Sequence, residues 1–286
     1  MLQVWVDDGL VPAEHATVSV YDRGFRTGEG VFETLRAYGE HVFRLRAHLE
    51  RARAGALELG FDPGPTDRLA EAVRRTATAN FETLDRRDSA LRLTVSAGRI
   101  DPDSPIPGRP AGPSTVVVTS HRLAEAPEAA HAVTVPLTRE LPHVKAVSYL
   151  VAMTARRRAK ELGADEALLT DERGRVLEGA GSNVFAVRDG TLLTPSADAG
   201  LLAGVTRGVV LELARAEGIG VDERPFDVVE LAGAEEAFLT STTRELVPLR
   251  TVDGYEIGGS PPGEVTRRLQ RAYAAEVVRE RAAGTW

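Results

Sequence analysis

The sequence contains no cysteine among its 286 residues. Disulfide bonds, a thiolate nucleophile and a cysteine-ligated metal are therefore excluded. No apolar run approaches the roughly 18 residues that a membrane-spanning helix requires. The beginning, MLQVWVDDGLV, has no basic segment followed by a long apolar core, so it does not predict a secretory signal. Together these absences predict a soluble cytoplasmic protein.

Several common functional motifs are also missing. The six histidines show no ligand-pair spacing such as H-x-x-x-H, and there is no P-loop. These absences disfavour a metal hydrolase and predict no metal site. The net charge of −7 disfavours a general nucleic-acid surface. With 43% hydrophobic and 27% charged residues, the chain can bury a substantial core. We therefore expect small-molecule substrates, without a nucleic-acid or membrane partner.

Lysine is nearly absent. Among the 35 lysine and arginine residues, only Lys145 and Lys160 are lysine. An arginine cannot shed its proton to become an amine nucleophile, so a retained lysine is informative. Lys145 has apolar neighbours in LPHVKAVSYLVAM, and a buried amine that loses its proton can form a Schiff base with an aldehyde. The plain alternative is a surface lysine, as expected for Lys160 in RRRAKE.

The order of expected elements indicates two α+β domains. We predict a small N-terminal domain over residues 1–120, a linker over 121–129 and a large C-terminal domain over 130–286. Alternating apolar residues predict early strands in VWVDDGLV, ATVSVYD and VFETLRAYGEHVFRL, and buried strands in ALRLTVSAG and STVVVTS. The Pro- and Gly-rich stretch RIDPDSPIPGRPAGP predicts a loop.

Helical spacing of apolar residues recurs in both predicted domains. In the first domain, it predicts LRAHLERARAGALELGF and PTDRLAEAVRRTATANFE, the latter with a cap at Thr66. In the second domain, SYLVAMTARRRAKELG is expected to end at Gly163, and GVTRGVVLELARAEG to begin at Gly204. VTRRLQRAYAAEVVRERAA reads as the closing helix.

Six segments in order carry a resemblance that runs nearly end to end. They are DRGFRTGEGVFETLR (22–36), HLERA (48–52), VKAVSYL (144–150), LEGAGSNVFAVRDG (177–190), LLAGVTRGVV (201–210) and TSTTRELVPLRTVDG (240–254). The chain resembles the fold-type IV pyridoxal-phosphate enzymes, the class IV aminotransferase family, which includes D-amino-acid transaminases, branched-chain aminotransferases and aminodeoxychorismate lyases. The resemblance implies a small N-terminal α/β domain, a larger β-rich domain that binds pyridoxal 5′-phosphate, and a homodimer with shared active sites.

The resemblance assigns roles around the cofactor ring. It implies that Lys145 forms the Schiff base with the cofactor and that Glu178 meets the pyridine nitrogen. A carboxylate there keeps the nitrogen protonated, so the ring accepts electrons from the substrate carbon. Tyr149 resembles the tyrosine that binds the phenolic oxygen of the ring. It would share a helix face with Lys145, four residues earlier, if a helix begins at the lysine. A core tyrosine is the alternative.

The same resemblance assigns donors to the cofactor phosphate. Arg51 matches the phosphate arginine, whose guanidinium can make two parallel bonds to phosphate oxygens. Val205 and Thr206, after Gly204, are expected at a helix N-terminus that offers free N–H groups to an anion. Ser241 and Thr242 resemble a second phosphate-binding turn. A solvated arginine and a hydroxyl-rich strand end are the alternatives.

The substrate site departs from the pattern of the best-known D-amino-acid transaminases. Those enzymes carry an Arg-x-His pair in a loop that corresponds to RIDPDSPIPG, where this chain has none. A substrate carboxylate still requires a cation or several N–H donors. The candidate substrate contacts are Arg92 in ALRLTV, Arg26 acting across a dimer interface, Arg99, Phe32 as a pocket wall and Thr243. Ordinary surface or core roles remain open for each.

The motifs favour a transaminase that moves the amino group of a D-amino acid to a 2-keto acid, with (R)-amines as a further substrate class. Thr27 stands where branched-chain enzymes usually carry a tyrosine. Two catalytic alternatives are an aminodeoxychorismate lyase, which eliminates pyruvate, and a branched-chain L-amino-acid aminotransferase. A cofactor-free scaffold with the same fold is the alternative that is not an enzyme.

Overall fold

The computed structural model describes residues 1–103 and 111–284, and its contacts divide the chain into two compact units. The first unit comprises Met1–Ala124, Val144–Ser148 and the last residues from Ala283, and the second comprises Glu125–His143 and Tyr149–Ala282. The division into two folding domains joined by a linker at 121–129 stays a prediction.

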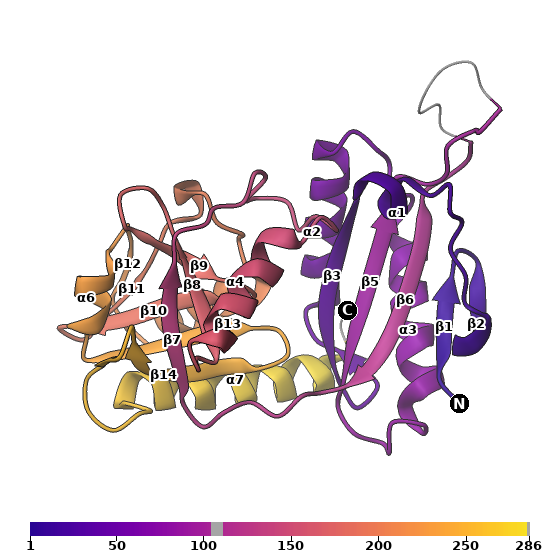
Figure 1. Ribbon diagram of the computed structural model, residues 1–286. Coiled ribbons are helices and arrows are strands. Elements are labelled where there is room, and N and C mark those ends of the chain that lie inside the picture. The colour runs from indigo at the N-terminus through magenta and orange to yellow at the C-terminus, as the bar shows by residue number, and fades with distance from the viewer. Residues whose placement is uncertain (104–110, 285–286) are drawn as a thin grey trace. The chain divides into compact units, whose positions relative to one another are not determined.

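The first unit is built on a six-stranded antiparallel sheet with the order β2-β1-β6-β5-β3-β4 (Figure 1). Its strands are β1 (Gln3–Val6), β2 (Gly9–Pro12), β3 (Gly30–Tyr38), β4 (His41–Val42), β5 (Ser89–Ser96) and β6 (Thr115–Arg122). Its helices are η1 (Ala13–His15), α1 (Arg23–Thr27), α2 (Leu45–Glu58) and α3 (Thr66–Phe81).

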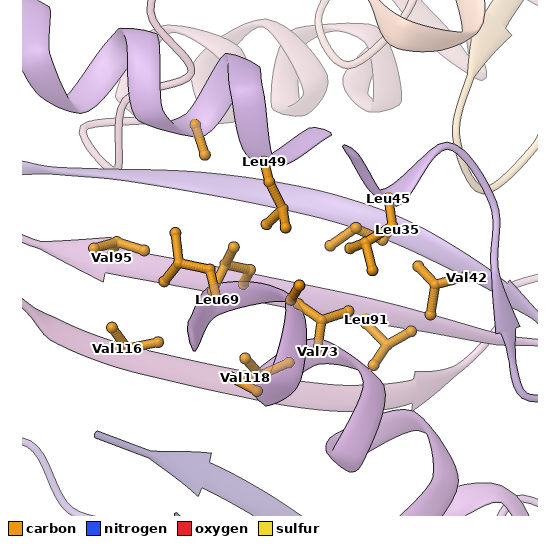
Figure 2. Close-up of a cluster of buried hydrophobic side chains, with 14 of the residues drawn as sticks. Leu35, Val42, Leu45, Leu49, Leu69, Val73, Leu91, Val95, Val116 and Val118 are labelled. Carbon is orange, nitrogen blue, oxygen red and sulfur yellow. The ribbon is translucent and has the colours of Figure 1, made fainter. Parts of the chain in front are cut away.

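The two faces of this sheet differ because successive strand side chains point in opposite directions. One face packs against α2 and α3 in a core that Figure 2 shows, including Leu35, Leu49, Leu69, Val73, Leu91 and Val118. Each such buried side chain contributes roughly 1.5–3 kcal/mol. The other face carries the cross-strand pairs Phe32–Thr94 and Thr34–Arg92. Polar and charged groups thus gather on the face turned away from the core.

The segment around Lys145 extends this sheet. The amide of Phe32 donates to the Lys145 carbonyl at 2.9 Å, and the amide of Val147 donates to the Gly30 carbonyl at 2.8 Å. The expectation that Lys145 enters a helix is therefore wrong, because its backbone is paired with β3. The next helix, α4 (Leu150–Glu161), begins five residues later.

The second unit is built on a nine-stranded mixed sheet, whose main path is β12-β11-β10-β13-β14-β7-β8-β9, with β15 paired to β14. Its strands are β7 (Ala130–Val135), β8 (Glu166–Thr170), β9 (Val176–Gly179), β10 (Asn183–Arg188), β11 (Thr191–Thr194), β12 (Val221–Glu223), β13 (Glu236–Ser241), β14 (Glu245–Val252) and β15 (Tyr255–Glu256). The remaining helices are η2 (Ala197–Ala199), α5 (Val205–Ala216), α6 (Val228–Ala232) and α7 (Glu264–Ala283). Every residue of β8 and β9 is buried, as expected for strands covered on both faces.

Two local expectations are corrected. Residues 16–22 form no strand, because the Ser19 hydroxyl and carbonyl accept hydrogen bonds from the amides of Tyr21 and Asp22 in a local turn. Asp22 then caps α1 by accepting from the amide of Gly24 at 2.8 Å. Thr66 is the first residue of α3 rather than its cap, and Pro65 precedes it without a side-chain bond.

Two other expectations concern boundaries. β6 continues to Arg122, two residues into the segment predicted as a linker. Part of the loop matched to Arg-x-His, residues 104–108, lies outside the described residues. In the described ranges, none of the helices combines the length and the apolar character needed to cross a bilayer.

Candidate active site

Lys145 and Arg92, both in the first unit, lie near the same aromatic ring, that of Phe32. Nζ of Lys145 lies 4.6 Å from the centre of the Phe32 ring, and the guanidinium carbon of Arg92 lies 3.7 Å from the same centre. Phe32 is 2% exposed, whereas Lys145 and Arg92 are half-buried. The cross-strand pairing of β3 and β5 sets Arg92 on the same face as Phe32. The structure therefore brings three of the predicted residues, Lys145, Phe32 and Arg92, into one cluster.

The opposite face of β3 holds Arg51 through a carboxylate that the motif analysis missed. Glu33 is fully buried, and its two oxygens accept hydrogen bonds from Nε and Nη2 of Arg51 at 2.7 and 2.6 Å. Nδ1 of His48 lies 2.7 Å from the Glu33 oxygen Oε2. This two-pronged pairing fixes the plane of the guanidinium.

The charge state of this cluster follows from its environment. Burial by itself would raise the pKa of Glu33, but the charge of Arg51 and hydrogen bonds from His48 and Arg51 outweigh it and lower the pKa to about 2. Burial lowers the pKa of His48, against the opposing effect of Glu33. An ionised carboxylate can only accept, so the His48 Nδ1 must carry the hydrogen. Arg51 is thus held rigidly by an anion, beside a neutral histidine.

In the second unit, Glu178 lies on β9 and is oriented from two sides. Nε of Arg139 lies 3.3 Å from Oε1 of Glu178, and both side chains are nearly buried. The other oxygen, Oε2, accepts a hydrogen bond from the amide of Leu202 at 3.2 Å. The sequence contained no periodicity or motif that singled out Arg139.

Tyr149 precedes α4 and therefore does not share a helix face with Lys145, contrary to the expectation. Its hydroxyl donates to the carbonyl of Ala180 at 2.8 Å. The guanidinium carbons of Arg139 and Arg156 each lie 5.7 Å from the centre of its ring. For Tyr149 to donate to a phenolic oxygen of the cofactor, its hydroxyl proton must turn away from Ala180.

The N-terminus of α5 has the form expected of an anion site. Gly204 is the residue before the helix, and no side chain caps the helix at this end. The first-turn N–H groups of Val205 and Thr206 are therefore not used by a cap. A Cβ at Gly204 would collide with the Asn183 side chain, whose Nδ2 donates to the Leu202 carbonyl at 2.9 Å. A side chain at position 204 would therefore force the Asn183 side chain, which braces the loop, to shift.

Ser241 ends β13, and Thr242 and Thr243 follow it in the turn to β14; all three are half-buried. The next residue, Arg244, donates through Nη2 to Oε2 of Glu166 at 2.6 Å. The same oxygen accepts from the Ser182 hydroxyl at 3.1 Å. Glu166 is 3% exposed, so this buried anion holds two turns that carry family motifs.

The remaining substrate candidates are less enclosed. Arg26 on α1 and Arg99 are exposed in the first unit, whereas Arg92 is half-buried. Within residues 1–103 and 111–284, no group of three or more His, Cys, Asp or Glu side chains could hold a metal ion.

Each unit carries chemical groups of the kind that a phosphorylated pyridine aldehyde requires. In the first unit these are the Lys145 amine and the Arg51 guanidinium. In the second unit they are the Glu178 carboxylate, the α5 N-terminus and the hydroxyl-rich turn. The buried hydroxyl of Thr240, next to that turn, has no hydrogen-bond partner among the described residues. An amine, a carboxylate and phosphate donors are the groups that a pyridoxal-phosphate enzyme requires.

Comparison with known proteins identifies the family of this chain. Residues 30–252 match the family model described as amino-transferase class IV, and the chain belongs to this family. It is 35% identical to a putative branched-chain-amino-acid aminotransferase of Methanocaldococcus jannaschii, over 95% of each chain. It is 31% identical to a D-alanine aminotransferase of Listeria monocytogenes, over 97% of each chain.

Solved structures show the same fold. The branched-chain aminotransferase of Thermoproteus uzoniensis, solved with norvaline, has a TM-score of 0.87 at 31% identity and covers 98% of this chain and 95% of its own. The branched-chain enzyme of Thermobaculum terrenum, solved in its PLP-form, has a TM-score of 0.81 at 28% identity, covering 96% and 93%. The cofactor of this family, and of this enzyme, is pyridoxal 5′-phosphate, whose ring withdraws electrons from a bonded substrate carbon.

The scarcity of lysine allows a direct test of the cofactor lysine. Borohydride reduction of the cofactor-loaded enzyme is expected to attach the cofactor to the peptide that contains Lys145, as peptide mass spectrometry can establish. The reason is that an amine next to an aldehyde forms the reducible bond. K160R should be labelled as the wild type is, and K145R should not be labelled. Label on Lys160, or on K145R, would contradict the assignment.

The buried Glu33 predicts a specific pH dependence of stability. Its pKa of about 2 in the folded state lies below the ordinary 4.5, so its stabilisation is complete above about pH 4.5 and is lost as the pH falls toward 2. Glu33→Gln should therefore lower the free energy of unfolding of the cofactor-free protein at pH 7 by roughly 3 kcal/mol. Denaturant unfolding should show this difference shrinking between pH 4.5 and 2.

A matched control comes from the exposed Glu50, which pairs with Arg46 at 2.8 Å on the same helix as Arg51. E50Q should change stability little, because exposed ion pairs contribute little. An E33Q effect that stays constant down to pH 2 would show that packing, rather than charge, accounts for it.

Proposed function

We propose that this aminotransferase moves the amino group of a D-amino acid to a 2-keto acid. The observation that supports an amino acid as substrate is Arg92, whose guanidinium lies over the Phe32 ring near the Lys145 amine. An amino-acid carboxylate must meet a cation close to the carbon that reacts at the lysine. Arg92 fills that need in a chain without the Arg-x-His pair.

The preference for the D-form rests on motif features. Thr27 replaces the tyrosine usual in branched-chain enzymes, and TSTTRE at 240–245 resembles the D-amino-acid transaminase and lyase branches. The 31% identity to D-alanine aminotransferases over nearly the whole chain agrees with this choice. An (R)-amine has the same arrangement about its reacting carbon without the carboxylate, and would be a weaker substrate.

Each residue has a separate role in the proposed reaction. Arg92 orients the substrate carboxylate, with Arg26 of the partner subunit as a second cation. The Lys145 amine would take the proton from the substrate α-carbon and hold it for return, while the cofactor would accept the electrons of that carbon. Glu178 holds a proton at the ring nitrogen, and Arg51 anchors the phosphate. Phe32 and Thr243 line the substrate side.

Transfer from branched-chain L-amino acids is the second candidate. It is favoured by the 35% identity to the Methanocaldococcus jannaschii protein and by the branched-chain aminotransferase structures that share the fold. Both candidates use the same lysine, ring carboxylate and phosphate donors. They differ in which face of the substrate carbon is turned toward Lys145.

The half-reaction separates the candidates. Cofactor-loaded enzyme mixed with D-alanine or D-glutamate should lose its aldehyde-form absorbance and gain that of the amine form, whereas L-leucine should react slowly. The reason is that only one hand presents the α-hydrogen to Lys145 while its carboxylate reaches Arg92. Fast reaction with L-leucine alone would establish the branched-chain alternative. Pyruvate release from aminodeoxychorismate without a keto-acid acceptor would establish the lyase.

Two arginine variants complete this test. R92M should raise the D-alanine concentration needed for half-maximal rate by roughly tenfold or more, since hydrogen bonds to charged groups contribute about 1.5–3 kcal/mol. R99M is the matched control, because Arg99 is an exposed arginine of the same unit. Equal effects of the two variants would remove Arg92 from its role.

We infer a cytoplasmic homodimer with shared sites. Val18, Val20, Tyr21 and Phe25 are exposed by 43–74% on the segment that leads into α1 and Arg26. Adjacent exposed apolar side chains of this size are typical of an interface. Sedimentation should give a dimer mass for the wild type and a larger monomer fraction for Phe25→Asp. A wild-type monomer with full activity would rule out shared sites.

A further inference from the structure

Arg139 is a nearly buried cation to which neither the sequence motifs nor the proposed reaction assigns a role. Its side chain is 12% exposed, and its Nε lies 3.3 Å from Oε1 of Glu178, whose side chain is 4% exposed. A buried guanidinium is costly unless an opposite charge compensates it. Nε makes no hydrogen bond within the described ranges, so its contact with Glu178 acts through charge.

Glu178 is held on both oxygens. Arg139 faces Oε1, while Oε2 accepts the Leu202 amide at 3.2 Å. Leu202 is two residues before Gly204, at the start of the segment that leads into α5. The carboxylate is therefore aimed by an ion pair and by a backbone donor at once, which leaves it little rotational freedom.

The proposed function sets the pyridine nitrogen of the cofactor against this carboxylate, and the inference rests on that contact. One proton is then shared between Glu178 and the ring nitrogen. If the proton lies on Glu178, the carboxylate is neutral and Arg139 loses its compensating charge. If the proton lies on the ring, Arg139 keeps its anion, and the positive ring has its own attraction to Glu178.

We propose that Arg139 is a positioning residue that keeps the shared proton on the ring nitrogen by holding Glu178 ionised. The effect is strong because burial weakens the screening of these charges. A protonated ring withdraws electrons from the substrate carbon better than a neutral one. Arg139 thus acts on the reaction through Glu178, without touching substrate.

Arg156 provides a matched comparison. Its guanidinium carbon lies 5.7 Å from the centre of the Tyr149 ring, the same distance as that of Arg139. Arg156 is an exposed residue of α4, and its guanidinium occupies the space beside Gly181. Of the two arginines, Arg139 is the one that pairs with Glu178 in the described part of the chain. Replacing Arg156 therefore removes a cation near Tyr149 and leaves the Glu178 pair intact.

The test measures whether the ring nitrogen of the cofactor is protonated. Wild type, R139M, R139K, R156M and E178Q are loaded with pyridoxal phosphate labelled with ¹⁵N in the ring, and the ¹⁵N resonance is recorded at pH 7.5. Wild type, R139K and R156M should show a protonated nitrogen. R139M should move the resonance toward that of neutral pyridine. It should also lower kcat roughly tenfold with little change in KM, since a tenfold change in the ratio of protonated to neutral ring nitrogen corresponds to one pKa unit.

The outcomes separate this inference from the proposed function. If E178Q leaves the resonance unchanged, Glu178 does not meet the ring nitrogen. The role proposed for Glu178 and the role of Arg139 then both fail. If E178Q shifts the resonance but R139M does not, the contact stands and the role of Arg139 is overturned. An equal shift in R156M would also overturn it. Should R139M not fold, a neutral ring nitrogen in the wild-type enzyme is sufficient to reject the proposal.

Discussion

The position of Lys145 and of its neighbours in the first unit depends on strand β3, which presents different residues on its two faces. Glu33 points to the core face, where it clamps Arg51, and its neighbour Phe32 points to the other face, beside Lys145 and Arg92. The backbone of Phe32 also binds the Lys145 carbonyl. The alternation of the strand thus sets the Arg51 guanidinium and the Lys145 amine on opposite faces of β3, at positions that cannot shift independently.

Buried carboxylates brace the motif residues throughout the chain. Glu33 holds Arg51, Glu178 is paired with Arg139, and Glu166 holds Arg244. The side chain of each carboxylate is at most 4% exposed, so losing its cation would leave an uncompensated charge in the interior. Arginine suits these positions because its planar fork stays charged and makes directional contacts. Lys145 does not share that constraint, since its chemistry requires an amine that can lose its proton.

The predicted site residues differ in how the structure holds them. The backbone of Lys145 pairs with that of Phe32, and Arg51 and Glu178 each belong to a buried ion pair. Arg92, the cation proposed for the substrate carboxylate, is half-buried over the Phe32 ring, on the face of the first sheet turned away from the core.

Most helices and strands, the family and the cofactor could be predicted from the sequence, because periodicity and motif order are properties of the linear chain. The prediction that Lys145 is the reactive amine came from chemistry, since arginine cannot replace it, and it stays a prediction. The sequence could not predict that the segment around Lys145 forms a bridge with β3, because that depends on long-range pairing with Gly30 and Phe32. It also could not pair Arg139 with Glu178, or Arg51 with Glu33. Ion pairs between distant residues leave no local pattern, and only folding decides which buried charges meet.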